Sequence, residues 1–159
     1  MRTDEQPLVG ELRVTAYQAL GLLSEGSDYA GTLRRFGFDG DFTVLVAVDD
    51  AGEIAGTITF EPFGPHSELA RDPAEADVRA FAVDARAQGQ GVGQQLLNAV
   101  VEYAAKHGVR RLRLCTQPAM TTAQHLYERA GFSRTPDLDF EPVPGLTLRA
   151  YELGLPPGG

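Results

Sequence analysis

The sequence predicts a mixed α/β fold, with a central sheet of about seven strands and helices packed on both faces of the sheet. Two β-prone stretches, residues 42–48 and 53–60, are separated by turn residues and therefore predict an antiparallel hairpin. A strand–helix–strand unit over residues 76–116 predicts a parallel strand pair joined by a right-handed crossover. The sheet has to contain both kinds of pairing, so it is expected to be mixed.

The chain before the hairpin is expected to hold one short strand and two helical segments. Alternating apolar and polar residues predict a strand at residues 11–15. Residues 17–23 are predicted to form a short helix or a turn. A further helix is expected to begin after Ser27, because serine is a preferred N-cap residue. The apolar residues of this helix recur at helical spacing, at Tyr29, Leu33 and Phe36.

The clearest helix prediction covers residues 91–107, between predicted strands at 76–83 and 110–116. Its main apolar residues recur every four positions, at Val92, Leu96 and Val100. This spacing places them on one face of the helix, which is expected to pack on the sheet. Gly108 follows the last turn, at the position where glycine ends many helices.

The C-terminal part is expected to hold one more helix and a last strand. Thr121 and Gln124 have the spacing of a capping box, which predicts a helix over residues 121–130. Gly131 stands where it would end that helix. A proline-rich connection then leads to a predicted strand at residues 146–153.

Length and composition indicate a globular protein with a single domain over residues 1–159. Apolar residues make up 43% of the chain and charged residues 23%, which is typical of this class. The formal net charge of −8 argues against a nucleic-acid partner and against docking on an anionic membrane. The acidic balance fits a cationic ligand such as an amine, and it fits simple solubility equally well.

Cysteine and histidine usage predicts neither an internal disulfide nor a metal site. Cys115 is the single cysteine, and the three histidines lie far apart in the sequence, at His66, His107 and His125. The first ten residues are polar and acidic, so no signal peptide is predicted. No apolar run approaches the roughly 20 residues that span a bilayer. The expected location is the cytoplasm.

The most informative segment is the glycine-rich run at residues 83–93, which joins a predicted strand directly to the helix of residues 91–107. A helix N-terminus carries unpaired N–H groups and a partial positive charge, and glycines let a phosphate approach them closely. The run therefore predicts an anion site, to which Arg86 would add a charged contact.

Other phosphate loops fit this run less well. A Walker A loop needs lysine after its last glycine, but Gln94 follows Gly93. A dinucleotide-binding loop needs glycine or alanine where Gln94 stands, and an acid at the end of the next strand, where Thr116 and Gln117 stand. The remaining alternative is a tight turn that binds no ligand.

Two blocks of sequence resemble the GNAT (GCN5-related) N-acetyltransferase family. The run Arg86-x-x-Gly89-x-Gly91 is similar to the coenzyme A loop of that family. The run 123–132, Ala-Gln-His-Leu-Tyr-Glu-Arg-Ala-Gly-Phe, is similar to the family pattern A-x-x-L-Y-E-x-x-G-F. The spacing of the blocks also matches, and the resemblance covers roughly residues 43–132. It implies a GNAT-like sheet, and direct transfer of an acetyl group from acetyl-CoA to a primary amine in a ternary complex.

The resemblance also implies how acetyl-CoA would bind. The backbone N–H groups of residues 88–93 would hold the pyrophosphate. The pantetheine arm would insert between the strands at 76–83 and 110–116, beside a bulge, and pair with the backbone of Phe81 and Val83. A backbone N–H near Phe81 would stabilise the oxyanion. The expected cofactor-binding residues are Phe81, Ala82, Val83, Arg86, Gln88, Gly89, Gln90, Gly91, Val92, Gly93 and Tyr127.

Tyr127 matches the tyrosine that acts as general acid in the family, where it protonates the departing thiolate. A structural interpretation is also open. With Gly131 just past the helix, Tyr127 and Phe132 occupy the two positions that form the hydrophobic contact of a Schellman cap. Both interpretations can hold together, since the ring can pack while the hydroxyl points into a cleft.

The general base is less clear, because Arg79 stands near the position where many family members have glutamate. Asp77 is the first candidate, and Glu75, Glu68 and a chain of water molecules are alternatives. Arg79 would instead hold a carboxylate or phosphate of the acceptor, or pair with a neighbouring acid such as Asp77 or Glu75. Arg79 and Thr116 are the expected acceptor-binding residues.

The other reactive side chains have simpler interpretations. Cys115 is expected to pack in the core, while His66 and His125 are expected to be exposed. Two loops, residues 61–74 and 134–145, are candidates for acceptor-side lids.

Three alternatives to a small-molecule acetyltransferase stay open: a coenzyme A-binding module without turnover, an acetyltransferase of peptide or protein amines, and, least favoured, a nucleotide-dependent oxidoreductase. A homodimer formed through a late strand is possible. The sequence does not specify the amine acceptor or the length of the acyl group.

Overall fold

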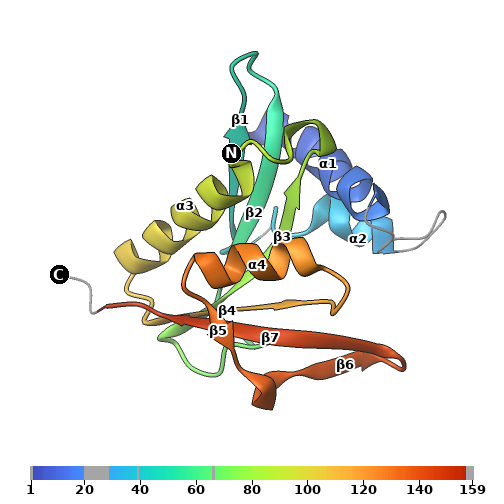
Figure 1. Cartoon of the computed structure of the whole chain (residues 1–159). Helices are drawn as coiled ribbons and strands as arrows, with labels where there is room; N and C mark the ends of the chain where they lie inside the picture. The colour runs from blue at the N-terminus through green and yellow to red at the C-terminus, as the bar shows by residue number, and fades with distance from the viewer. Residues whose placement is uncertain (1, 20–28, 39, 66, 157–159) are drawn as a thin grey trace. The chain divides into compact units, whose positions relative to one another are not determined.

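A computed structural model describes residues 2–19, 29–38, 40–65 and 67–156 (Figure 1). The helices are α1 (Gln6–Ala19), α2 (Tyr29–Arg35), α3 (Val92–Lys106) and α4 (Thr121–Arg129), with short 3₁₀ turns at Thr3–Glu5, Ala85–Ala87 and Pro136–Leu138. The strands are β1 (Thr43–Val48), β2 (Ile54–Pro62), β3 (Glu75–Val83), β4 (Arg111–Thr116), β5 (Ser133–Arg134), β6 (Phe140–Val143) and β7 (Leu146–Gly154). None of the described helices is long and apolar enough to cross a membrane.

The seven strands form a mixed sheet, as the sequence predicts. Their order is β1-β2-β3-β4-β7-β5, and β6 pairs with β7. The β1–β2 hairpin is antiparallel, β3 and β4 are parallel, and β7 runs antiparallel to β4, β5 and β6. In the parallel pair, Glu75 lies opposite Arg111, Ala76 opposite Leu112 and Asp77 opposite Arg113.

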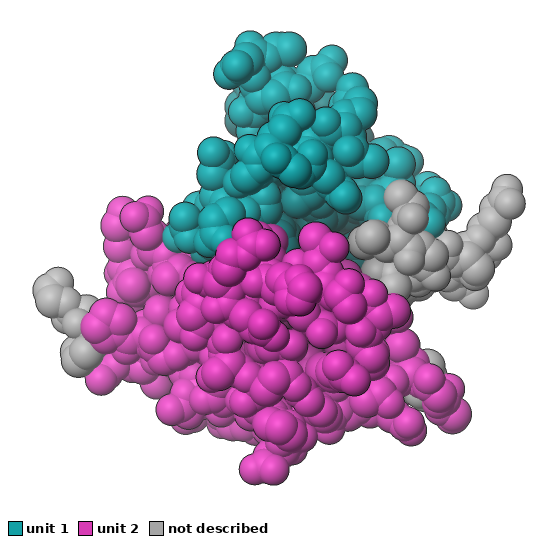
Figure 2. All heavy atoms as spheres, in the orientation of Figure 1, with its two compact units in different colours: residues 1–61, 79–100 teal, residues 62–78, 101–159 magenta. Residues whose placement is uncertain are grey.

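The chain divides into two compact units, which are described separately (Figure 2). Unit 1 comprises residues 1–61 and 79–100, and so contains the hairpin, the end of β3, the glycine-rich run and the start of α3. Unit 2 comprises residues 62–78 and 101–159, and contains β4 to β7, α4 and the loop before β3.

Within unit 1, the two faces of β2 contact different helices. An ideal Cβ on Gly56 would lie 2.8 Å from Leu96 and 3.0 Å from Val92, so α3 packs directly on this face. Side chains alternate along a strand, so Thr59 points to the opposite face, where it accepts a hydrogen bond from Arg13 of α1. The helices therefore cover both faces of this part of the sheet.

The predicted strand at residues 11–15 is wrong, because this segment belongs to α1. Its buried positions include Val9, Leu12, Arg13 and Ala16, the spacing of a helix rather than of a strand. Gly10 lets the helix approach α2, since a Cβ there would lie 2.7 Å from the carbonyl oxygen of Arg34. The end of the segment predicted at 17–23 and the predicted N-cap Ser27 lie outside the described residues.

Most of the later elements agree with the sequence prediction. Both helix ends predicted at Gly108 and Gly131 are confirmed. The N–H of Val109 donates to the carbonyl of Ala104, and that of Phe132 to the carbonyl of Tyr127, each at 3.0 Å. Such bonds satisfy carbonyl groups that the end of a helix would otherwise leave without partners.

Two C-terminal predictions need correction. Met120, not Thr121, is the N-cap of α4, and the side-chain amide of Gln124 donates to the carbonyls of Gln117 and Pro118 instead of closing a capping box. The proline-rich connection, expected to be a loop, contains β5 and β6. Both strands are short, and β6 pairs irregularly with β7, so their local sequence signal is weak.

We expect the substitution Gly56→Val to lower the free energy of unfolding by about 1–3 kcal/mol, because the added atoms would collide with Leu96, Val92 and the carbonyl oxygen of Ala82. Thermal unfolding followed by circular dichroism would show a fall in Tm of several degrees. Gly154→Ala is the control, since a Cβ there meets nothing within 4 Å. Equal Tm values for the two variants would contradict the close packing of α3 on β2.

Candidate functional site

The glycine-rich run presents an exposed backbone at the start of α3. Gly89 and Gly91 have φ angles of +80° and +83°, which glycine adopts without strain, and nothing lies within 4 Å of an ideal Cβ on either residue. Gln95 donates its N–H to the carbonyl of Gly91, so the N–H groups before it belong to the open first turn of the helix. The N–H groups of Gln88 and Gln90 donate within the run, to the carbonyls of Ala85 and Ala87 at 3.4 and 3.3 Å. The open donors at the positive end of the helix dipole are therefore those that follow Gln90.

The run is held to β2 at its beginning. The N–H of Asp84 donates to the carbonyl of Ala55 at 2.8 Å, and Asp84 also accepts the N–H of Arg86 at 2.9 Å. Gln88 is exposed at the end of the 3₁₀ turn, Gln90 donates its side-chain amide to the carbonyl of Arg86, and Val92 and Gly93 are half-buried in the first turn of α3.

The end of β3 has one unusual backbone conformation. Ala80 has a φ of +49°, a left-handed value that costs a non-glycine residue about 1–3 kcal/mol. A residue in this conformation within a strand is typical of a bulge, which changes the direction of the backbone groups that follow it. Those groups belong to Phe81, Ala82 and Val83, of which Ala82 is buried and the other two are half-buried.

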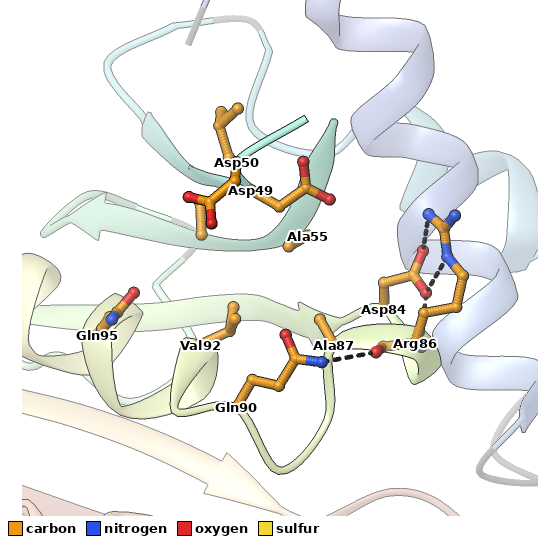
Figure 3. Close-up of a pocket in the computed structure, with 11 residues that line it drawn as sticks. Asp49, Asp50, Ala55, Asp84, Arg86, Ala87, Gln90, Val92 and Gln95 are labelled. Atoms are coloured by element: carbon orange, nitrogen blue, oxygen red, sulfur yellow. Dashed lines mark hydrogen bonds and ion pairs between the residues drawn. The ribbon is translucent and has the colours of Figure 1, made fainter. Parts of the chain in front are cut away.

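Arg86 is turned away from the open backbone of the run (Figure 3). Its Nε and Nη2 atoms donate to the carboxylate of Asp84 at 3.1 and 3.2 Å, and its Nη1 atom lies 3.4 Å from Glu53. Hydrogen bonds from Arg86 hold the pKa of Asp84 below its usual value, and the same contact raises the pKa of Arg86. A phosphate contact by Arg86 would need both ion pairs to open.

Unit 1 also contains a pocket of about 470 Å³ between the hairpin turn and the glycine-rich run (Figure 3). Three aspartates, Asp49, Asp50 and Asp84, line it, and Arg86 is the one cation among the described lining residues. An anion is disfavoured there, because carboxylates outnumber cations. Gln90 of the glycine-rich run and Val92 of α3 also line the pocket, so it adjoins the start of α3, but its charge does not suit a phosphate.

Arg79, an expected acceptor-binding residue, pairs with Glu61 at the end of β2. Its Nη1 atom lies 2.9 Å from Oε2 of Glu61, and its guanidinium carbon lies 4.7 Å from the centre of the Phe36 ring. The side chain of Arg79 is 24% exposed and that of Glu61 is 5% exposed. Sequence reasoning missed Glu61, although an acidic residue that closes a strongly apolar strand is a recognisable signal.

The three acidic candidates for the general base lie in unit 2, where each has a partner. Asp77 is fully buried, and its two oxygens accept the N–H groups of Leu69 and Ala70 at 3.0 and 2.9 Å. Glu75 pairs with Arg113 at 2.7 Å. Glu68 accepts a hydrogen bond from the Cys115 thiol at 3.2 Å. These contacts fix the part of the 61–74 loop that lies next to β3 and β4.

Tyr127 lies in unit 2 with only 4% of its surface exposed. Its ring centre is 6.1 Å from that of Phe132 and 5.9 Å from that of Tyr151, so the expected cap contact is present. Thr116 is buried at the end of β4 and donates its hydroxyl to the sulfur of Met120 at 3.3 Å.

The structure also describes the other candidate residues in part. His125 is exposed, and Cys115 is half-buried. His66 lies outside the described residues. Across the described ranges, no three histidine, cysteine, aspartate or glutamate side chains gather in a way that could hold a metal ion.

Known proteins resemble this chain over its central part in sequence and over almost its whole length in structure. The model of the Acetyltransferase (GNAT) family matches residues 11–132. A mycothiol acetyltransferase of Arthrobacter sp. (strain FB24) is 36% identical over 90 residues, which cover 57% of this chain and 27% of that protein. The human N-acetylaspartate synthetase is 34% identical over 72 residues, 45% of this chain and 24% of that protein.

The chain thus spans about a quarter of the length of these curated relatives. Among solved structures, an acetyltransferase of the GNAT family from Staphylococcus aureus Mu50 superposes with a TM-score of 0.78 at 18% identity. The alignment covers 98% of this chain and 96% of that one. This likeness supports the fold.

We expect the Asp84–Arg86 contact to make stability depend on pH. Since the pKa of Asp84 is lower in the folded chain than the roughly 3.9 of an unfolded chain, its contribution is complete above that value. It is lost as the pH falls through the folded pKa. Asp84→Asn should therefore show a smaller fall in Tm between pH 5 and pH 3 than the wild type, and Asp50→Asn serves as the control. Parallel curves for Asp84→Asn and the wild type would contradict this coupling.

Proposed function

The chain belongs to the Acetyltransferase (GNAT) family, and from this we propose that it transfers an acetyl group from acetyl-CoA to a primary amine. The observation that carries the proposal is the open backbone at Gly89 and Gly91, at the N-terminus of α3. A pyrophosphate needs several N–H donors that converge without side chains in the way, and this run meets that requirement.

For donor binding, the backbone of residues 88–93 holds the pyrophosphate in this proposal, mainly through the N–H groups that follow Gln90, because those of Gln88 and Gln90 already donate within the run. Phe81, Ala82 and Val83 follow the irregular backbone at Ala80, and their peptide groups pair with the amides of the pantetheine arm. Arg86 is engaged by Asp84 and Glu53, so we assign most of the phosphate binding to the backbone and a secondary contact to Arg86.

In the proposed transfer step, the neutral amine of the acceptor attacks the thioester carbon. The new C–N bond forms, and the negative charge on the carbonyl oxygen is stabilised by a backbone N–H near Phe81. When the C–S bond breaks, coenzyme A leaves as a thiolate and takes the hydroxyl proton of Tyr127. The proton lost from the amine goes to the general base.

We propose Asp77 as that base. The carboxylate already accepts two backbone N–H groups, and a carboxylate offers about four lone-pair sites, so these bonds do not exclude a further contact with an amine or a water molecule. Asp77 would then have two tasks, since the same group also fixes the loop at Leu69 and Ala70.

The acceptor is proposed to be a small molecule or a peptide with a primary amine. The relatives reported above are named for acetylation of mycothiol and for synthesis of N-acetylaspartate, and both names point to small acceptors. Thr116 and Arg79 are the proposed acceptor contacts.

We expect saturating acetyl-CoA, and coenzyme A as well, to raise the Tm by roughly 5–10 °C, because a ligand at 100 times its Kd adds about 2.7 kcal/mol to the folded state. NADH should produce no shift. Gly91→Trp should abolish the shift by filling the pyrophosphate site. Gly145→Trp is the control, as Gly145 also has a positive φ and open surroundings. A normal shift in Gly91→Trp would remove the loop assignment. A shift in the wild type, with no free thiol released from acetyl-CoA in the presence of any amine, would favour a binding module.

We expect Tyr127→Phe to lower kcat about tenfold or more while leaving the Kd for acetyl-CoA unchanged, because the ring contacts with Phe132 and Tyr151 persist and only the hydroxyl is lost. Release of free thiol at several pH values measures the effect. Tyr151→Phe removes a hydroxyl from the neighbouring buried ring and should leave kcat as it is. Equal rates for Tyr127→Phe and the wild type would make Tyr127 a packing residue only.

A further inference from the structure

We propose that the acceptor is a free amino acid or a similar small amino-carboxylate, and that Arg79 binds its carboxylate. This inference rests on the proposed acetyl transfer and adds the chemical class of the acceptor. Four features of unit 1 carry it. They are the surroundings of Arg79, a second guanidinium (Arg13) near the same residues of β2, the combined charge of Arg13, Arg79 and Glu61, and the position of Arg79 along β3.

Arg79 presents a guanidinium that is both oriented and accessible. Glu61 holds it from one side at 2.9 Å, and the Phe36 ring supports its flat face at 4.7 Å. A stacked guanidinium loses little freedom when it binds, and its five N–H donors form a planar fork that suits a carboxylate. About a quarter of the side chain remains exposed, whereas Glu61 is nearly buried. Glu61 is thus a positioning residue, and Arg79 is the group that a ligand can reach.

Arg13 places a second positive charge near the same residues of β2. It is fully buried and donates to the carbonyls of Leu33 and Phe36 and to the hydroxyl of Thr59, and its guanidinium lies 4.9 Å from the Phe38 ring. All of these partners are uncharged, and its Nε has no hydrogen-bond partner in the described part of the chain. Because the buried charge is poorly solvated, the pKa of Arg13 is lowered to about 10.

The two guanidinium groups lie around the same residues. Arg13 contacts the backbone of Phe36 and the side chain of Thr59, while Arg79 contacts the ring of Phe36 and the side chain of Glu61. Thr59 and Glu61 are two residues apart on β2, so they point to the same face. The layer of Arg13, Arg79 and Glu61 therefore joins two positive groups and one negative group.

A monoanionic ligand fits this layer better than a phosphate does. Buried charges are usually compensated, and one carboxylate would balance the two guanidinium groups and Glu61. A phosphate ester carries about −1.5 to −2 charges near neutral pH and would meet Glu61 with an excess of negative charge. The contact with Glu61 demonstrates that the Arg79 guanidinium donates to a carboxylate oxygen in this environment.

The position of Arg79 also suits an amine close to the carboxylate. Arg79 lies two residues before Phe81, which is about 7 Å along an extended strand and less where the backbone is irregular, as it is at Ala80. Phe81 is where we place the oxyanion contact of the acetyl group. The carboxylate contact and the oxyanion contact thus come from neighbouring positions of one strand, which favours an acceptor with its amine and carboxylate close together, as in an α-amino acid.

The test compares each L-amino acid with its carboxamide as acceptor, with release of free thiol from acetyl-CoA as the measurement. The two compounds have the same amine and side chain and differ only in the negative charge. We expect kcat/KM for at least one amino acid to exceed that of its carboxamide about tenfold or more, the usual size of a charge-assisted hydrogen bond. O-phosphoethanolamine and small peptides complete the panel.

Variants connect this preference to Arg79. Arg79→Gln should remove the preference by raising KM for the amino acid, with little effect on the carboxamide. Arg79→Lys keeps the charge next to Glu61 but lacks the planar fork, so it should retain only part of the preference. This variant also serves as a second test in case Arg79→Gln does not fold. Arg34→Gln is the control, because Arg34 is an exposed arginine of α2 that pairs with Glu11.

Several results would overturn the inference and leave acetyl transfer in place. These are equal or better turnover of carboxamides, peptides or O-phosphoethanolamine, or a preference that persists in Arg79→Gln. If no compound in the panel is acetylated, the inference is also wrong. The thermal shift with acetyl-CoA then separates the two proposals. If acetyl-CoA raises the Tm, the proposed donor site stands and only the acceptor inference is wrong. If it does not, the proposed function is wrong as well.

Discussion

The close packing of α3 on β2 is the constraint on which the proposed donor site depends. Gly56 has no side chain, so Val92 and Leu96 of the first turns of α3 reach the strand at this point. The same strand accepts the N–H of Asp84 one residue earlier, at Ala55. Contacts with β2 thus hold both the beginning of the glycine-rich run and the beginning of α3. The open N–H groups between them are pre-organised, which reduces the entropy that binding a phosphate would otherwise cost.

The opposite face of β2 is organised by polar groups instead of apolar ones. Arg13 connects α1, the end of α2 and β2 through three hydrogen bonds, although burying a guanidinium is expensive. An apolar side chain of similar size would fill the space without that cost. The positive potential of the buried guanidinium would attract a negatively charged acceptor such as the one proposed here, which gives a reason for its burial. The phenylalanines around it support the flat faces of both guanidinium groups.

The sequence predicts the local structure around the proposed donor site because its signals are local. The apolar face of α3, the glycine stop at Gly108 and the run containing Gly89 and Gly91 each depend on a few consecutive residues. The first helix was missed for the opposite reason. Leu12 and Val14 alternate with polar residues over only five positions, whereas the helical spacing of Val9, Leu12 and Ala16 extends beyond that window, and Arg13 adds a charged residue to the same core. Charged residues are seldom buried, so no local rule assigns Arg13 to the core.

The proposed acceptor contacts depend on interactions between distant residues, and this is why their chemistry cannot be predicted from local patterns. Arg79 meets Glu61 across 18 positions, and Arg13 meets Thr59 across 46. Each of these residues has an ordinary interpretation when it is considered alone. A phosphate can be held by backbone groups that every sequence possesses, so a glycine pattern is enough to mark the place. A particular acceptor has to be distinguished by side chains, and these are brought together only by the complete fold. Under the proposed function, recognition of the amine is therefore the property that can differ most between chains that share the same glycine-rich run.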